Sequence, residues 1–306
     1  MSTEAQNQEK YYVPEKSSIP IIFAVATLFV GYGAASAIVG NGTTMLFVGM
    51  IALIITMGFW WAVVIRESQA GLDTPALNNS YVYGMGWFIF SEVMFFFAFF
   101  GALFYIRSFA VPWLGGEGEK GLAGELLWPE FEANWPPMIT PEQSVMGEQA
   151  LTVGPDENMY LRNISDVFSW LPLWNTIVLL SSSGTVHFAH VALKDGNRKR
   201  FNFWLAITVT LAFIFVILQA VEYYEAYSHL GLTLSSGVYG TTFFMLTGFH
   251  GMHVLIGGIF LLTQLTRSTG YKHFTPKEHF GFEAASWYWH FVDVVWVCLF
   301  LFVYIL

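Results

Sequence analysis

Long apolar runs separated by short polar segments recur along the whole chain. Each run covers the roughly 20 residues that an α-helix needs to cross a hydrocarbon core about 30 Å thick. The pattern therefore predicts an all-α polytopic membrane protein with seven transmembrane helices. We expect these helices at residues 19–39, 44–65, 82–106, 170–192, 202–224, 238–265 and 284–306.

The composition agrees with a bilayer location. Hydrophobic residues make up 55% of the 306 positions and charged residues only 11%, whereas soluble domains have roughly 25% charged residues. The segment 1–18 is polar and lacks the features of a signal peptide, so the first span is interpreted as a mature helix. The single cysteine, Cys298, excludes an intrachain disulfide and a CxxC metal site.

The distribution of basic residues predicts the orientation, because Lys and Arg are enriched on the cytoplasmic side. With a cytoplasmic N-terminus, ten basic residues lie on that side and three on the other, and a missing or additional helix would break this alternation. We therefore predict a cytoplasmic N-terminus and a periplasmic C-terminus. The larger group is Lys10, Lys16, Arg66, Lys194, Arg198, Lys199, Arg200, Arg267, Lys272 and Lys277, and the smaller is Arg107, Lys120 and Arg162.

The net charge of −9 is concentrated in the predicted extracytoplasmic loop at about residues 107–169. This loop holds ten acidic residues, from Glu117 to Asp166, against three bases. Its surface would attract a basic partner electrostatically. A solvated loop without a partner is also consistent with this composition, and the Gly and Pro residues of the loop predict an irregular structure.

One carboxylate, Glu92, interrupts the aromatic-rich stretch "WFIFSEVMFFFAFF" of the third predicted helix. At about 1.5 Å per residue it lies roughly 15 Å into that helix, near the bilayer centre. A charge at this depth costs at least about 2.5–3.5 kcal/mol. Glu92 is therefore expected to be protonated or paired with a donor inside the bundle. A proton-linked role and a structural hydrogen bond both remain open.

Further polar residues lie in the later helices, and several of them could meet in one interior network. His250 and His253 are three residues apart, as are His187 and His190, so each pair shares one helical face, as metal ligands would. The chain has no Glu-x-x-His motif of the di-iron bundles; haem ligation fits the spacing, but we expect no bound metal. The candidate interior residues are Glu222, His250, His253, Glu283, His290 and Asp293.

The second predicted helix ends in "FWWAVVIRES", which places two tryptophans close to a charged pair. Aromatic residues near charge are typical of the membrane interface, where they anchor a helix. The cation could also hold a lipid phosphate. The candidate lipid-binding residues are Trp60, Trp61, Arg66 and Glu67.

Four stretches of the chain closely resemble subunit III of the haem-copper cytochrome c oxidases, and the resemblance covers most of the chain from about Trp60. The stretches are "YVYGMGWFIFSEVMFFFAFFGALFY", "LQAVEYYEA", "SSGVYGTTFFMLTGFHGMHVLIGG" and "HFGFEAASWYWHFVDVVWVCLF". The resemblance implies that a cleft separates the first two helices (19–65) from the other five (82–306) and holds phospholipids. It also implies that Glu92 matches the family's carbodiimide-reactive glutamate, and that Trp60 to Glu67 lie in its region of lipid contact.

The same resemblance implies a subunit without redox centres. Haem and copper would belong to subunits I and II, and cytochrome c would be the electron donor of the complex. This chain would pack on subunit I, support proton uptake and protect the enzyme during turnover. It would lie in a bacterial inner membrane, its non-protein partners would be phospholipids, and no nucleic-acid partner is expected.

Two departures from the family pattern stand out. Asp73 occupies a position where relatives often carry a histidine, and residues 141–168 are interpreted as an insertion. Two rival functions are considered. Subunit III of a quinol oxidase characteristically lacks the first two helices, which this chain is predicted to have. A proton-coupled transporter would require inverted repeats and broken helices, and we see neither in the sequence.

Overall fold

The computed structural model describes residues 16–72, 75–161, 163–271, 273–276 and 279–306. Most of the predicted N-terminal segment 1–18 therefore lies outside the described residues. The same holds for five residues discussed above, which are Lys10, Asp73, Arg162, Lys272 and Lys277.

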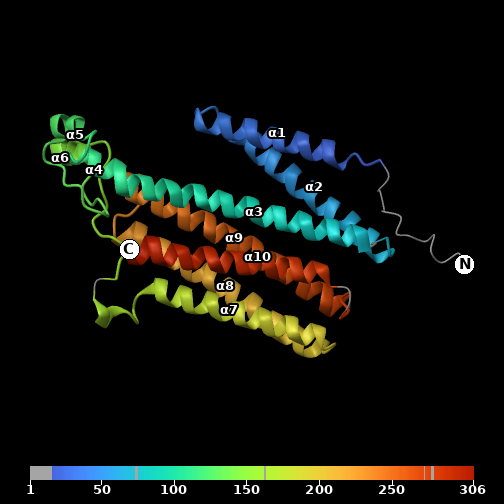
Figure 1. Cartoon of the computed structure of the whole chain (residues 1–306). Helices are drawn as coiled ribbons and strands as arrows, with labels where there is room; N and C mark the ends of the chain where they lie inside the picture. Colours follow the sequence, from blue (N-terminus) through green and yellow to red (C-terminus); the bar gives the residue numbers. More distant parts are fainter. Residues whose placement is uncertain (1–15, 73–74, 162, 272, 277–278) are drawn as a thin grey trace, which may run out of the picture. The chain divides into compact units, whose positions relative to one another are not determined.

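All the regular structure in the described part of the chain is helical, and seven helices are long and apolar enough to cross a membrane (Figure 1). This confirms the predicted fold class. Two spans continue through a short π-helix: η2 (Ile106–Ala110) and α4 (Val111–Leu114) extend α3, and η5 (Phe300–Ile305) extends α10. The main helices are α1 (Ile19–Ile38), α2 (Thr44–Gln69), α3 (Pro75–Tyr105), α7 (Leu171–Lys194), α8 (Arg198–His229), α9 (Gly237–Gly270) and α10 (Phe280–Leu299).

The third helix begins at Pro75 rather than at residue 82, as predicted from the apolar run. Proline suits the first turn of a helix because its missing N–H would have no partner there. The polar residues that follow continue the helix, and the Ser80 hydroxyl donates to the Ala76 carbonyl at 3.3 Å. Hydropathy thus locates the apolar part of this helix but not its start. Glu92 consequently lies about 25 Å, not about 15 Å, from the start of the helix, and it remains in the middle of the span.

The chain divides into two compact units, Met1–Gly84 and Met85–Leu306, with the boundary inside α3. In the first unit, α1 and α2 form an antiparallel hairpin that packs through glycines. A Cβ atom at Gly33 would overlap the backbone of Leu46, and one at Gly49 would overlap the backbone of Val30. Small residues are typical of such close helix contacts in membranes, because packing rather than water exclusion drives the association.

In the second unit, α7 packs on α8, α8 on α9, α9 on α10 and α10 again on α7 (Figure 1). The core of this bundle is aromatic, and Trp289, Trp296 and Phe215 are completely buried. The α7–α8 connection is short because Gly196 adopts a φ of 72° and Asn197 caps α8, its side chain accepting from the Arg200 N–H at 3.1 Å.

The part of α3 that belongs to the second unit lies against α9 and α10 through ring contacts. Phe95 meets Phe249 of α9 with ring centroids 5.0 Å apart. Phe96 meets Phe291 of α10 at 6.1 Å. Edge-to-face and tilted rings of this kind add to packing beyond their buried area. They bring the Glu92 side of α3 onto the four-helix core.

The acidic loop is more ordered than its glycines and prolines predict. It contains α5 (Leu122–Leu127) and α6 (Pro141–Met146), and Thr140 forms a capping box with Gln143 at the start of α6. The loop is joined to α9 where the Met159 N–H donates to the Tyr239 hydroxyl at 3.1 Å. The Tyr160 hydroxyl of the loop accepts a hydrogen bond from the Trp135 indole at 3.1 Å. Burial raises the pKa of Tyr160, and the phenol is therefore protonated at neutral pH.

Candidate functional site

Glu92 of α3 is paired with His253 of α9. The Glu92 carboxyl Oε2 lies 2.9 Å from His253 Nε2. The other ring nitrogen, Nδ1, lies 2.6 Å from the Phe249 carbonyl oxygen. A carbonyl oxygen only accepts hydrogen bonds, so Nδ1 must carry a proton.

This tautomer determines the protonation of the pair. If the imidazole is neutral, Nε2 has a lone pair and the Glu92 carboxyl must donate its proton. If the imidazole is charged, Nε2 donates to the Glu92 carboxylate. In both forms one proton lies between Nε2 and Oε2, and the pair as a whole is neutral. A neutral pair avoids the cost of an isolated charge in the membrane.

Aromatic rings enclose the Glu92–His253 pair. The His253 ring lies 5.1 Å from the Phe96 ring and is stacked on Tyr288 at 6.4 Å, measured between centroids. The exposed fraction is 7% for the His253 side chain and 22% for that of Glu92. The histidine is therefore enclosed, while part of the Glu92 side chain remains accessible.

Glu222 of α8 is completely buried and binds groups from two other helices. Its Oε2 accepts from the Asn175 amide of α7 at 2.8 Å, and its Oε1 accepts from the Tyr304 hydroxyl at 2.5 Å. Tyr304 belongs to the π-helical turn η5 at the end of the last span. Three elements of the bundle therefore meet at one carboxyl group.

His250 and His290 form two further groups. His250 is completely buried, and its Nε2 lies 3.2 Å from the Val292 carbonyl of α10. His290 Nδ1 lies 2.9 Å from the Ser183 hydroxyl of α7 and 3.6 Å from Asp293 Oδ2. Asp293 is almost fully buried, with 4% of the residue exposed. These contacts join α9 and α7 to α10.

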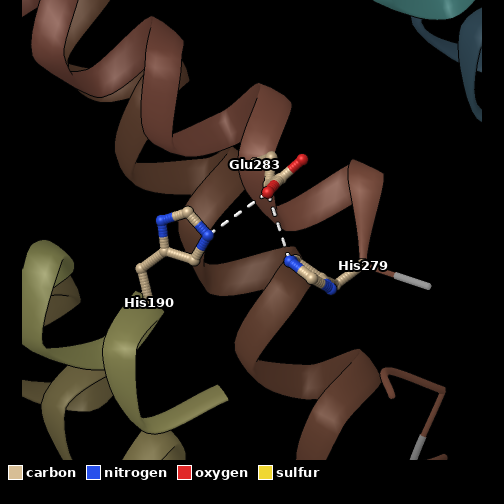
Figure 2. Close-up of side chains that lie close together, drawn as sticks. All are labelled: His190, His279 and Glu283. Carbon is tan, nitrogen blue, oxygen red and sulfur yellow. Dashed lines mark ion pairs between the residues drawn. The ribbon is translucent and has the colours of Figure 1, made fainter. Parts of the chain in front are cut away.

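Glu283, in the first turn of α10, lies between two histidines (Figure 2). Its Oε1 is 3.3 Å from His190 Nε2 of α7 and 3.2 Å from His279 Nε2. Of the pair His187 and His190, only His190 joins this group. His187 is exposed, and its ring lies next to that of Phe188.

The predicted interior residues are thus distributed over several groups rather than gathered in one network. Glu283 and Tyr304 lie near opposite ends of the last span, on the order of 30 Å apart at 1.5 Å per residue. The predicted polar residues of α10 lie near its start, at Glu283, and near its middle, at His290 and Asp293, so they contact different neighbouring residues.

The predicted lipid-binding residues lie near the end of α2. Trp60 and Trp61 are about half exposed, at 46% and 47%, and Trp60 meets Phe23 of α1 edge-on at 6.0 Å. Arg66 is exposed in the last turn of the helix, where a positive charge interacts favourably with the helix dipole. Glu67 is half-buried.

Sequence reasoning did not identify four residues of these groups, namely Asn175, Ser183, His279 and Tyr304. The signal for His279 is its spacing of four residues from Glu283, which places both on one face at the start of a helix. Asn175 and the adjacent Thr176 are the two polar residues of the otherwise apolar first turns of α7. Tyr304 carries no comparable signal, because tyrosine is common at the end of any membrane span.

The fold and these groups define a polytopic α-helical membrane protein whose buried carboxyl groups are held by histidine, amide and phenol side chains. A family model for cytochrome c oxidase subunit III matches residues 9–117 and 163–306. Similar proteins include cytochrome c oxidase subunit 3 of Carassius auratus, 40% identical over 98% of both chains, and that of Latimeria chalumnae, 41% identical over the same share. Subunit 3 of Gadus morhua is 40% identical over 96% of both chains.

The chain therefore belongs to the cytochrome c oxidase subunit III family. It is a non-catalytic subunit of an oxidoreductase complex, and its seven apolar helices make it a multi-pass membrane protein. The family model leaves residues 118–162 unmatched. This segment overlaps the predicted insertion at 141–168 and starts earlier, within the acidic loop.

Proposed function

We propose that this chain is subunit III of a proton-pumping cytochrome c oxidase, in which it packs on subunit I, has subunits I and II as partners, and supports proton uptake and stability during oxygen reduction. The observation that carries the proton-linked part is the Glu92–His253 pair, which shares one proton across 2.9 Å. The shared proton can move between Glu92 Oε2 and His253 Nε2 without changing the net charge of the pair, so the pair would pass on a proton when one is delivered on one side and removed on the other. Haem and copper would reside in the partner subunits.

The lipid-binding role is proposed for the end of α2. Exposed Trp60 and Trp61 would pack against acyl chains, and the exposed cation of Arg66 would bind a lipid phosphate. Glu67 would lie beside this headgroup. The lipid-holding cleft between the two-helix and five-helix parts stays a prediction from the family resemblance.

The orientation and the electron donor are proposals based on charge. The positive-inside rule favours an N-terminus on the cytoplasmic side of the membrane and a C-terminus on the opposite side, which is the periplasm if the membrane is a bacterial inner membrane. The relatives named above are from fish. Most acidic residues of the loop are exposed, which would favour a basic donor such as cytochrome c. The exposed residues are Glu117, Glu119, Glu125, Glu130, Glu132, Glu148, Asp156 and Asp166.

Co-purification tests this function. The tagged chain, extracted in a mild detergent, is expected to bring with it the haem-bearing and copper-bearing subunits and to oxidise cytochrome c. The presence of α1 and α2 favours this activity over quinol oxidation. A complex that oxidises quinol but not cytochrome c would replace the proposed donor, and a chain that purifies without any haem-bearing partner would contradict the proposal.

The variant Glu92→Gln is expected to retain steady-state oxygen reduction within a factor of about two, or roughly 0.4 kcal/mol of activation free energy. The glutamine amide can still donate to His253 Nε2, and the redox chemistry lies in other subunits. Oxygen consumption of the assembled complex, measured with an oxygen electrode, checks this. Complete loss of oxidase activity in a normally assembled complex would show that Glu92 is more than a supporting residue.

A further inference from the structure

Three potential metal ligands converge where the end of α7 meets the start of α10 (Figure 2). They are His190 Nε2, His279 Nε2 and Glu283 Oε1, and all three atoms lie within 4.8 Å of one another. Oε1 lies 3.3 Å from the first nitrogen and 3.2 Å from the second. In a tetrahedral zinc site with bonds of about 2.0–2.1 Å, neighbouring ligand atoms are separated by roughly 3.3 Å.

The proton positions favour metal binding at His279. Its Nδ1 lies 3.1 Å from the Thr275 carbonyl oxygen, which can only accept, so Nδ1 carries the proton. In the neutral ring, Nε2 therefore has a lone pair directed at the Glu283 carboxyl. A backbone carbonyl that orients the second nitrogen is the usual arrangement of metal-binding histidines.

In the described part of the molecule, the two nitrogen atoms that face Glu283 have no hydrogen-bond partner. His190 Nε2 and His279 Nε2 are both inaccessible to solvent, and neither makes a hydrogen bond there. With both Nε2 atoms unprotonated, two nitrogen lone pairs and a carboxylate oxygen would face one another, and a cation between them would remove the repulsion. The side chains of His190 and Glu283 remain 22% and 29% exposed, which leaves an approach for an ion and a water.

We propose that His190, His279 and Glu283 bind a divalent zinc ion, with water as the fourth ligand. Two imidazoles and one carboxylate form a ligand set that suits Zn²⁺, whereas Mg²⁺ and Ca²⁺ prefer oxygen ligands alone. Lys194 lies one turn beyond His190 on α7, and its charge weakens the binding without filling the site. The ion joins α7 to α10 and stabilises the folded bundle.

This inference is independent of the proposed role of Glu92. The zinc site uses the start of α10, whereas His253 and Glu92 belong to α9 and α3. An oxidase that assembles and turns over normally could bind zinc or not, and a chain that binds zinc could fail to assemble with haem-bearing subunits. Each proposal can therefore fail without the other.

Zinc titration of the full-length chain tests the site. The chain, purified in detergent and treated with a chelator, is titrated with Zn²⁺ at neutral pH in competition with a chromophoric chelator. We expect one equivalent to bind and to raise the unfolding temperature of the chain. Cobalt substitution should give the intense visible absorption of a four-coordinate site.

Three variants assign the ligands. Glu283→Gln and His279→Gln are each expected to weaken zinc binding by at least about tenfold, since even losing a partner of a ligand costs 10–100-fold. His190→Gln provides a third test if either of these fails to fold. His187→Gln is the matched control, because it removes an exposed histidine one turn away on the same helix. Equal zinc affinity in wild type and in all folded ligand variants, or no zinc binding by the folded wild type, would overturn the proposal.

Discussion

Replacement of Glu222 by alanine is expected to lower the free energy of unfolding of the five-helix unit by roughly 2–6 kcal/mol. The change leaves the Asn175 amide and the Tyr304 hydroxyl buried without their common acceptor. Each buried polar group that loses its partner costs about 1–3 kcal/mol. A cavity at a completely buried position adds to this cost.

The stability of the Glu222→Ala chain is measured by titration with a denaturing detergent, followed by circular dichroism. Glu225→Ala is the control, because Glu225 is exposed on the same helix three residues further on, and it should change the stability by less than about 0.5 kcal/mol. Tyr304→Phe should produce about half of the Glu222→Ala effect or less, since one hydrogen bond is lost. Equal stability of the two alanine variants would contradict the assigned role of Glu222.

The second large effect is expected for Gly33→Leu in the first unit. A side chain at this position overlaps the backbone of Leu46, and backbone cannot move aside without separating the helices. Overpacking of this kind costs about 1–3 kcal/mol or more. We expect α1 and α2 to move apart by roughly 2 Å, the range over which side chains change interhelical distances.

Spin labels at Ile21 and Ile55 can measure this separation, in a Cys298→Ala background. Both labelled positions are exposed, at 68% and 67%, so the labels should not disturb the packing. Gly31→Leu is the control, because a Cβ there meets no atom within 4 Å. An unchanged distance in Gly33→Leu, or the same increase in both variants, would show that the close contact at Gly33 does not hold the two helices together.

The sequence predicts the seven spans because each apolar run is long enough to cross a bilayer. It misplaces helix ends where polar residues continue a helix, as before Val82 in α3 and after Tyr224 in α8. Such polar residues lower the mean hydropathy of the segment, so the apolar run ends before them. Their backbone hydrogen bonds nevertheless continue the helix. The sequence also does not predict the regular structure in the acidic loop. That structure depends on contacts between distant residues, such as the one between Met159 and Tyr239, which are 80 residues apart.

The candidate site was predicted only in part. Depth in the membrane showed that Glu92 needs a proton or a donor, but not that the partner is His253, 161 residues later. Which residue pairs with Glu92 depends on how each helix is rotated about its own axis. The sequence gives little indication of that rotation, because most faces of these helices are apolar. For the same reason, the spacing of His187 and His190 placed both on one face of α7 but gave no indication that His190 lies beside His279 and Glu283 at the start of α10.

The hydrogen bond between Glu222 and Tyr304 also bears on the order in which the bundle is assembled during synthesis. The two residues are separated by 82 positions, and a ribosome adding 5–20 residues per second needs roughly 4–16 s to make that stretch. Helix α8 is therefore synthesised and able to enter the membrane well before its phenol partner exists, while Asn175 has already been made. The last turn of the final span thus completes a contact that earlier helices have left open, which makes it a late step in the biogenesis of the bundle.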